Sequence, residues 1–491
     1  MRWMRLVPIL AAAASLTALA MVALLEMAAA PGLQVRDEAL AGSPATIYQD
    51  ASDPGPLVLV AHGYGGSRQM MRPLSLALAR AGFTVAAFDF HGHGRHRVPM
   101  DADVTSIEGT TAQLVEQTVA VGAAARAATG VDGPLALLGH SMATDVVIRA
   151  APAMGAAAVV AISMYSEAVT PEAPARLLIV SGAREGRLRE VALGALRQVG
   201  PDAAEGETAR AGDAVRRVVA APGVGHVGVL YSAATMREAA SWIAAATEAG
   251  DPGAPLPRDA PWTALLLAAV IALAWPAARL AGTAGPVRRA PLPRRTAALA
   301  VLGPAVTAVA AAALLPDGAL GLAAFGPLAA FLGVWGAAQS AILWRAGRRL
   351  PSPGWRAGAI WLGWAVVFAA ALDRYGASFA PSGPRAGVMA LMALGTVPFL
   401  AGDALLARGS GIALRIAARA AALAALLGAM LLAPRLGVAF TVLPVAVLFW
   451  LVFGLAARPF AAAAGAAMPL ALAIALAWAI ASSTPLIAAG A

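Results

Sequence analysis

Ser141 is the residue whose surroundings most clearly suggest chemistry. It lies in the stretch Leu135–Arg149, where a short apolar run is followed by a turn and then by a helical pattern. Gly139 and Ala143 stand two residues before and two residues after it, and small residues there leave room for a sharp strand-to-helix turn. Such a turn exposes the serine hydroxyl, and the amino end of the next helix favours negative charge beside it. The spacing therefore predicts that Ser141 is a nucleophile.

A serine nucleophile needs a general base and an acid that orients this base. His226 is the only histidine after the serine, and it follows a predicted strand, so it is the candidate base. Glu185 comes three residues after Gly182, at the end of another predicted strand, and is the preferred acid. Glu167 and Asp213 also lie between the serine and the histidine and stay open as alternatives.

The oxyanion that forms during acyl transfer needs hydrogen-bond donors, which are usually backbone N–H groups. The N–H of Met142, directly after the serine, is one candidate. The N–H of Tyr64 is the other, because it lies in the run Gly63-Tyr64-Gly65-Gly66, whose glycines let the main chain approach a ligand.

Four histidines near the first predicted strands raise the question of a metal site. They are His62, His91, His93 and His96, and the only carboxylate beside them is Asp89. Without cysteine or further acidic residues the set is a poor match to a zinc site. We expect these histidines to shape the wall of the pocket, and we expect neither a metal nor another cofactor.

Apolar runs of four to six residues alternate with helical patterns from residue 34 to residue 250. The predicted strands are 57–61, 83–88, 135–138, 157–162, 176–181 and 216–220, and the clearest predicted helices are 72–81, 107–128 and 234–246. This alternation predicts an α/β domain over 34–250, with a mostly parallel sheet covered by helices on both faces. The Pro-rich stretch 251–261 is predicted to be a linker.

The second half of the chain has the composition of a membrane protein. The 491 residues are 59% hydrophobic and only 13% charged, and the apolar excess lies mainly beyond Pro261. We predict a membrane domain over 262–491 with about eight transmembrane helices, at 262–281, 296–315, 319–343, 357–373, 386–407, 411–433, 436–456 and 460–482. Residues 1–30 are predicted to be an uncleaved transmembrane anchor rather than a signal peptide.

Charge gives the predicted orientation. The net charge is +9, every basic residue is arginine, and many arginines lie in short loops between the apolar spans. This distribution fits the positive-inside rule and not a nucleic-acid surface. It predicts a multi-pass protein of the inner or plasma membrane, with a cytoplasmic amino terminus and the α/β domain outside. The absence of cysteine means that this domain would be stable without disulfides.

Three charged residues stand near the predicted inner ends of two adjacent spans: Asp403, Arg415 and Arg419. Charged residues within membrane spans usually pair with one another or form a functional polar site. Pairing is the preferred interpretation. No relay of aspartate, glutamate or histidine typical of a proton-driven transporter is visible in the sequence, and the abundant glycine and alanine fit close helix packing.

The ordered motifs resemble the α/β-hydrolase superfamily. The segments HGYGG, DFHGHG, LALLGHSMA, LLIVSGARE and GVGH, within residues 55–247, are similar to the branch that holds monoacylglycerol lipases and serine aminopeptidase-like enzymes. The resemblance implies a Ser141–His226–Glu185 triad with Tyr64 and Met142 as oxyanion donors. Ala143 replaces the usual glycine, Glu185 replaces the usual aspartate, and the short connection after Ile162 leaves no room for a large lid.

The sequence thus predicts a membrane-bound serine hydrolase that cleaves an ester or related acyl bond of a lipid-like substrate, with peptidase activity less expected. Acyl transfer by the same triad remains an alternative. A transporter or scaffold with a non-catalytic, hydrolase-like binding domain is another. The sequence does not indicate the oligomeric state.

Overall fold

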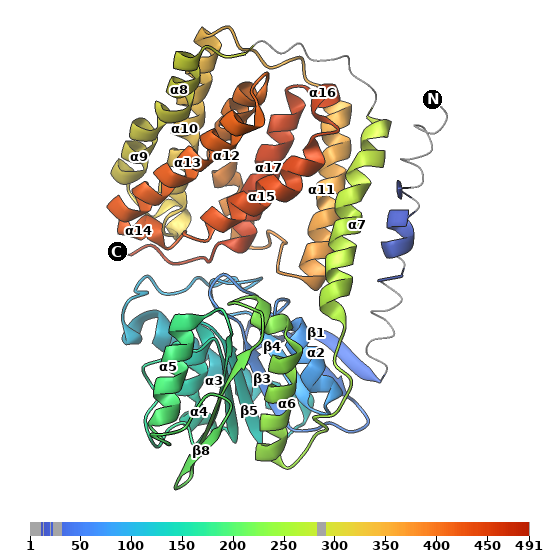
Figure 1. Cartoon of the computed structure of the whole chain (residues 1–491), viewed down its shortest axis with the longest axis vertical. Coiled ribbons are helices and arrows are strands. Elements are labelled where there is room, and N and C mark those ends of the chain that lie inside the picture. The colour runs from blue at the N-terminus through green and yellow to red at the C-terminus, as the bar shows by residue number, and fades with distance from the viewer. Residues whose placement is uncertain (1–10, 13, 20, 23–31, 282–290, 491) are drawn as a thin grey trace. The chain divides into compact units, whose positions relative to one another are not determined.

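The chain folds into two compact units (Figure 1). The computed structural model describes residues 11–12, 14–19, 21–22, 32–281 and 291–490. The α/β unit contains Val22–Ala264 and the short stretch Arg374–Ser378, and the helical unit contains Leu265–Asp373 and Phe379–Ala491. The predicted anchor over 1–30 falls mostly outside the described residues, but those described between 11 and 22 are helical.

The α/β unit is built on one sheet with the strand order β1-β2-β4-β3-β5-β6-β7-β9-β8. Its strands are β1 (Leu33–Leu40), β2 (Ser43–Asp50), β3 (Leu57–Ala61), β4 (Thr84–Phe88), β5 (Leu135–His140), β6 (Ala158–Ile162), β7 (Arg176–Gly182), β8 (Thr208–Ala211) and β9 (Ala214–Ala221). The six strands from β4 to β9 in that order pair in parallel, whereas β1, β2 and β8 pair antiparallel with their neighbours. The predicted α/β fold with a mostly parallel sheet is confirmed.

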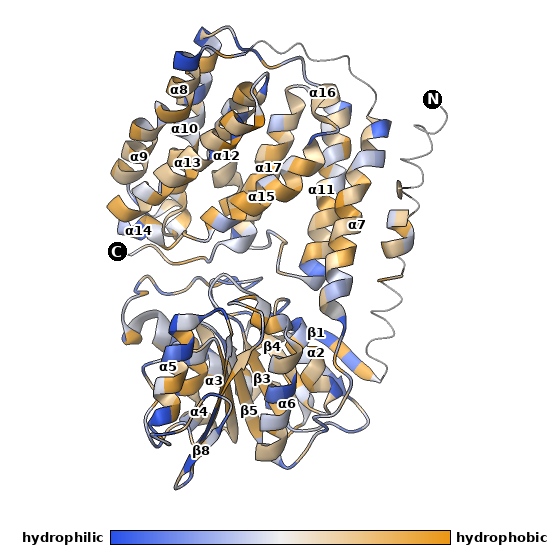
Figure 2. Ribbon diagram, in the orientation of Figure 1, coloured by the Kyte–Doolittle hydropathy of each residue, from blue (hydrophilic) through white to orange (hydrophobic). Residues whose placement is uncertain are grey.

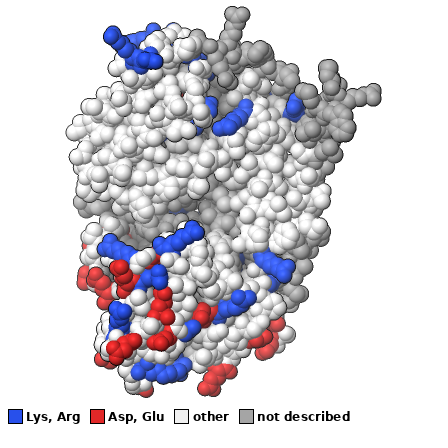
Figure 3. Space-filling model, viewed as in Figure 1, with Lys and Arg blue, Asp and Glu red and all other residues white. Residues whose placement is uncertain are grey.

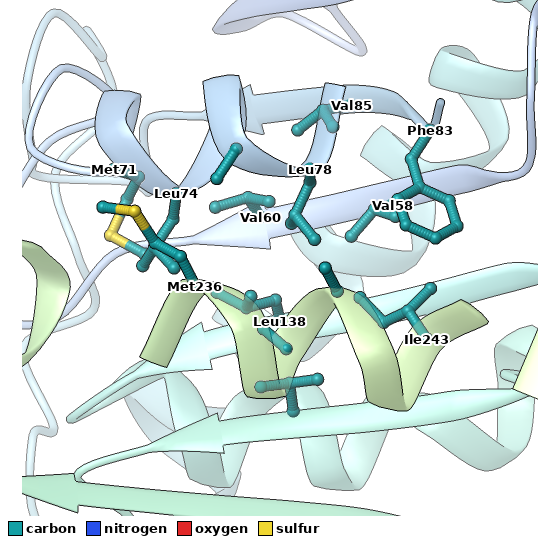
Figure 4. Packing of buried hydrophobic residues seen from close by; sticks show 14 of the residues in the cluster. Val58, Val60, Met71, Leu74, Leu78, Phe83, Val85, Leu138, Met236 and Ile243 are labelled. Atoms are coloured by element: carbon teal, nitrogen blue, oxygen red, sulfur yellow. The ribbon is translucent and has the colours of Figure 1, made fainter. Parts of the chain in front are cut away.

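Helices cover both faces of this sheet. They are α2 (Arg72–Arg80), α3 (Ala112–Thr129), α4 (Ala143–Met154), α5 (Gly186–Arg197) and α6 (Ala233–Thr247). On one face α2 and α6 pack over alternate residues of β3 and β5, including Val58, Val60 and Leu138 (Figure 4). On the other face α3 passes so close to β3 that a side chain at Gly122 would contact Leu59. Both faces are buried, which explains why these strands are continuously apolar.

Two hairpins at the sheet edges did not stand out in the sequence. β1 and β2 are joined by Ala41-Gly42, and both residues have positive φ, as the tight turn of a two-residue hairpin requires. β8 and β9 are joined by Gly212 and Asp213, of which Gly212 has positive φ. Alanine is an unusual residue for the first position of such a turn, so the sequence carried only a weak signal.

The helical unit is apolar along most of its length (Figure 2). Six helices of its described residues are long and apolar enough to cross a membrane: Ala260–Leu280 in α7 (Asp259–Leu280), the pair α8 (Arg294–Leu302) and α9 (Pro304–Leu314), α10 (Phe325–Arg345), α11 (Trp355–Tyr375), α12 (Pro384–Ala407) and α13 (Ile412–Leu432). Figure 3 shows charged side chains gathered over the α/β unit, while the visible surface of the helical unit is largely uncharged.

The last two predicted spans are shorter in the structure than in the sequence analysis. α15 (Val442–Ala457) and α17 (Ala467–Ser483) are apolar helices below the length of the other six. The chain forms short helices before each of them, α14 (Pro434–Gly437) and α16 (Ala461–Ala464). Gly465, whose φ of 53° is positive, ends α16 and separates it from α17. The described residues therefore contain six candidate spans and two shorter apolar helices where eight spans were predicted.

Candidate active site

Three residues that the sequence analysis singled out meet at the carboxyl ends of the central strands. His226 Nδ1 lies 2.6 Å from Glu185 Oε1, and His226 Nε2 lies 2.9 Å from Ser141 Oγ. A carboxylate only accepts hydrogen bonds, so Nδ1 carries the ring proton and Nε2 accepts the hydrogen bond of the serine hydroxyl. This geometry allows the imidazole to take the serine proton. The catalytic roles remain predictions, but the three side chains form one connected chain of hydrogen bonds.

The backbone around Ser141 has the shape that its small neighbours predict. Ser141 has a φ of 54° at the turn between β5 and α4, a conformation that costs energy for a residue with a side chain. A Cβ at Gly139 would lie 2.6 Å from the Ala143 carbonyl oxygen, and one at Gly63 would lie 2.9 Å from Ser141 Cβ. Glycine at these two positions is therefore required by close approach of the main chain.

The environment of Glu185 explains how an isolated carboxylate is held in place. Its side chain is only 6% exposed. Its Oε2 accepts hydrogen bonds from the Ser163 hydroxyl, at 2.8 Å, and from the Gly182 N–H, at 2.5 Å, which leaves Oε1 for His226. The two alternative acids lie elsewhere: Glu167 lines the pocket described below, and Asp213 is exposed in the β8–β9 turn.

His140, the last residue of β5, supports His226. Its Nε2 lies 2.9 Å from the carbonyl oxygen of His226, so it donates a hydrogen bond that positions the loop of the candidate base. Burial, and to a smaller extent the nearby His226, lower the pKa of His140 to about 4. The ring is neutral at physiological pH. The sequence analysis did not assign a role to this residue.

Thr144 ties the serine turn to the next loop. Its buried hydroxyl donates to the Ser141 carbonyl oxygen at 2.6 Å and accepts a hydrogen bond from the Tyr165 N–H at 3.1 Å. A threonine here joins two walls of the site that are far apart in the chain.

Ser141 opens onto a pocket of about 570 Å³. Tyr64 and Met142, the residues of the two candidate oxyanion donors, line the pocket beside the serine. A segment between β4 and α3, which includes Met100 and Ile107, forms another part of its wall, and no pattern in the sequence indicated this. The chain from the end of β6 to the start of β7 spans only residues 163–175, consistent with the expected absence of a large lid there.

The pocket also contains charged groups. Asp145 and Arg149, one turn apart on α4, form an ion pair of 2.8 Å, and the Ser166 hydroxyl donates to the same carboxylate. Glu167 completes the charged lining. The pocket thus combines apolar surface with paired and unpaired polar groups, as small-molecule sites do.

The other histidines have structural contacts in the α/β unit. His62 Nε2 accepts a hydrogen bond from the Phe90 N–H, and His96 Nδ1 accepts one from the Val98 N–H. The buried Asp89 accepts hydrogen bonds from the Arg68 N–H and guanidinium group. Among the described residues no group of three or more histidine, cysteine, aspartate or glutamate side chains could hold a metal ion.

Comparisons with known proteins found a matching family model and similar solved structures. Residues 52–186 match the family model described as serine aminopeptidase, S33. No curated protein matches the chain. Among solved structures, TT1662 from Thermus thermophilus is 21% identical, with 44% of this chain and 99% of that chain covered and a TM-score of 0.33.

Two further solved structures are similar to part of this chain. Dienelactone hydrolase from Anabaena variabilis is 17% identical, with 44% of this chain and 99% of that chain covered and a TM-score of 0.34. A hormone-sensitive lipase from a metagenome library is 16% identical, with 46% of this chain and 92% of that chain covered and a TM-score of 0.33.

Proposed function

We propose that this chain, whose residues 33–247 form an α/β-hydrolase domain, is a membrane-bound serine hydrolase that cleaves a carboxylic ester. The observation that carries the proposal is the continuous hydrogen-bond chain from Glu185 through His226 to Ser141, which ends at an open pocket. A buried acid, an imidazole and a serine in this order are the parts that acyl transfer needs.

In the proposed mechanism Ser141 Oγ attacks the acyl carbon and His226 Nε2 takes the hydroxyl proton. The imidazolium is stabilised by Glu185 and then gives this proton to the leaving alcohol. The N–H groups of Tyr64 and Met142 stabilise the oxyanion. Water attacks the acyl-enzyme while His226 takes one of its protons, and His226 then returns this proton to Ser141 Oγ as the acid is released.

The pocket supports a small or single-chain acyl substrate. Its volume of about 570 Å³ lies within the range of about 300–1,000 Å³ that is common for small-molecule sites. Met100, Val104 and Ile107 supply an apolar wall for an acyl chain. The six candidate spans support attachment to a membrane, so lipid-like esters are the first substrates to test.

Aminopeptidase activity is a second candidate, because two carboxylates, those of Asp145 and Glu167, line the same pocket. An acidic group beside the nucleophile suits the ammonium group of a free amino terminus. Asp145 is already paired with Arg149, so Glu167 would carry this recognition.

The test uses the full-length protein in neutral detergent, with p-nitrophenyl esters of increasing chain length and aminoacyl p-nitroanilides as parallel substrates. A fluorophosphonate probe reports the activated serine. We expect ester turnover and labelling of the wild type, with losses of about 10⁴-fold or more in kcat for Ser141→Ala and His226→Ala. Glu185→Ala is expected to cost less than either.

The matched control is Ser52→Ala, which removes an exposed serine hydroxyl outside the pocket and should leave both signals unchanged. A folded wild type that neither labels nor turns over any substrate would contradict the hydrolase proposal. Turnover of the anilides without the esters would replace the ester hydrolase with the aminopeptidase.

A further inference from the structure

The helical unit contains its own pocket, of about 230 Å³, between the ends of four helices. The end of α12, the start of α13, the end of α15 and the start of α17 all contribute to it. Four arginines line it together with a single aspartate, and these are Arg408, Arg415, Arg419, Arg458 and Asp403. Among the lining residues positive charge therefore exceeds negative charge.

Asp403 forms a two-point ion pair with Arg419. Arg419 donates to both oxygens of Asp403, at 3.0 and 2.8 Å, and its guanidinium carbon lies 5.0 Å from the centre of the Trp450 ring. These contacts hold Arg419 in place against a pocket wall. The pairing that the sequence analysis preferred is present for Arg419, and Arg408, Arg415 and Arg458 also line the pocket.

The remaining lining is apolar. Leu400, Trp450, Met468 and Leu472 come from three different helices and place hydrocarbon next to the guanidinium groups. A simple inorganic anion would gain nothing from this surface. A ligand with an anionic head and an apolar part would use both kinds of contact.

The pocket lies at the arginine-rich end of the helical unit. α8 begins at Arg294, α10 ends at Arg345 and α11 begins at Trp355 with Arg356 next to it, and the chain direction places these termini at the same end as the last turn of α12. The connection from α9 to α10, at the other end, carries Asp317 and no arginine. Arginine-rich ends of membrane helices face the cytoplasmic leaflet, which is rich in anionic lipids.

We propose that this pocket binds the phosphate headgroup of an anionic phospholipid, with Arg408, Arg415 and Arg458 around the phosphate and the apolar wall against the first part of the acyl chains. Arginine suits this role because its planar group donates two parallel hydrogen bonds to phosphate oxygens. The volume fits a headgroup and not a whole lipid, so the chains extend into the bilayer. The site is independent of the serine hydrolase proposed above.

The experiment is native mass spectrometry of the full-length protein in neutral detergent, titrated with phosphatidylglycerol or with phosphatidylcholine that has the same acyl chains. We expect one phosphatidylglycerol to be retained at least about tenfold more tightly than phosphatidylcholine. Arg458→Gln changes an exposed pocket residue and should weaken this retention about fivefold, the effect of one arginine near a charged lipid. Arg458→Lys keeps the charge and should retain most of the affinity.

Arg294→Gln is the matched control, because this arginine lies at the same end of the unit and does not line the pocket. It should leave the titration unchanged. Equal binding of the two lipids would overturn the proposal. Equal weakening by Arg458→Gln and Arg294→Gln would also overturn it, because that result indicates general attraction to a basic surface. Displacement of the lipid by glycerol 1-phosphate at the lipid's own concentration would identify a free phosphate compound as the occupant instead.

Discussion

The two oxygens of Glu185 have different partners, and this division defines how the acid works. Oε1 accepts the hydrogen bond of His226 Nδ1–H, while Oε2 accepts hydrogen bonds from the Ser163 hydroxyl and the Gly182 N–H. A glutamate side chain has one more rotatable bond than an aspartate. The two donors on Oε2 remove this extra freedom, which explains how glutamate can serve where the resemblance implies aspartate.

Ser163→Ala should therefore impair the candidate triad without removing any member of it. A hydrogen bond to a charged group contributes about 1.5–3 kcal/mol, so we expect kcat/KM for an ester to fall by about 10- to 100-fold. The measurement is ester hydrolysis by the full-length protein, followed across pH. Ser181→Ala is the control, because this buried serine lies on β7 and has no hydrogen bond to Glu185. Equal losses in both variants would show a general effect of packing instead.

The buried histidines predict how stability depends on pH. The folded-state pKa is lowered by burial to about 4 for both His140 and His96, while an unfolded histidine titrates near about 6.5. Between these values the unfolded chain binds protons that the folded chain excludes, so the free energy of unfolding falls as the pH falls from 6.5 to 4. Each histidine can contribute about 3 kcal/mol across this window.

Thermal unfolding of the full-length protein in neutral detergent at pH 7 and pH 5 checks this expectation. The midpoint should be lower at pH 5, and His140→Gln should reduce the difference because glutamine has no charge to gain. A midpoint that stays constant or rises on acidification would contradict it.

The sequence was sufficient to predict the candidate triad but not the residues whose hydrogen bonds position it. Ser141, His226 and Glu185 could be selected because the sequence itself shows their order and their positions after predicted strands. Ser163, His140 and Thr144 act through contacts between separate strands and loops. A lone serine or threonine in a loop carries no signal of such contacts before the fold is known.

At the scale of elements, the turn between β5 and α4 allows a paired test of small residues. Gly139→Ala would place a Cβ 2.6 Å from the Ala143 carbonyl oxygen, so we expect a loss of about 1–3 kcal/mol in stability and slower probe labelling. Ala143→Gly restores the glycine of related motifs and removes only a methyl group. It should keep labelling close to the wild type, with about 1 kcal/mol lower stability from the glycine in a helix. Melting curves and fluorophosphonate labelling rates of both variants provide the measurement, and a faster-labelling Gly139→Ala would contradict this account.

Strands could be predicted from the sequence where a continuous run of apolar residues marked them. The parallel strands from β4 to β9 are buried on both faces and were found as continuous apolar runs, with ends within a few residues of those observed. β1, with its polar residues, and the four-residue β8 lack this pattern, and only pairing with β2 and β9 makes them strands. The last two predicted spans are longer than the helices α15 and α17 because hydropathy does not show the break at Gly465 or the late start of α15 at Val442.

At the scale of the whole molecule, the predicted orientation can be tested directly because the chain contains no cysteine. Single substitutions can report which side of the membrane each position faces. Asp213→Cys lies in the exposed β8–β9 turn, and Gly411→Cys lies between α12 and α13, where an added Cβ meets no other atom. We expect a membrane-impermeant maleimide to label Asp213→Cys in intact cells and to label Gly411→Cys only after the membrane is opened. The reverse pattern would invert the orientation.

The outermost strands also determine how neighbouring copies of the α/β unit behave when they are crowded on one membrane surface. A sheet that ends in flat, apolar strands can join the sheet of the next molecule edge to edge. Here β1 carries Arg36, Asp37 and Glu38 in consecutive positions, and β8 has only four residues, one of them Arg210. The charged side chains of β1 at one edge and the short length of β8 at the other edge disfavour strand pairing between molecules. We therefore expect a high density of these molecules in a membrane not to cause edge-to-edge aggregation of their sheets.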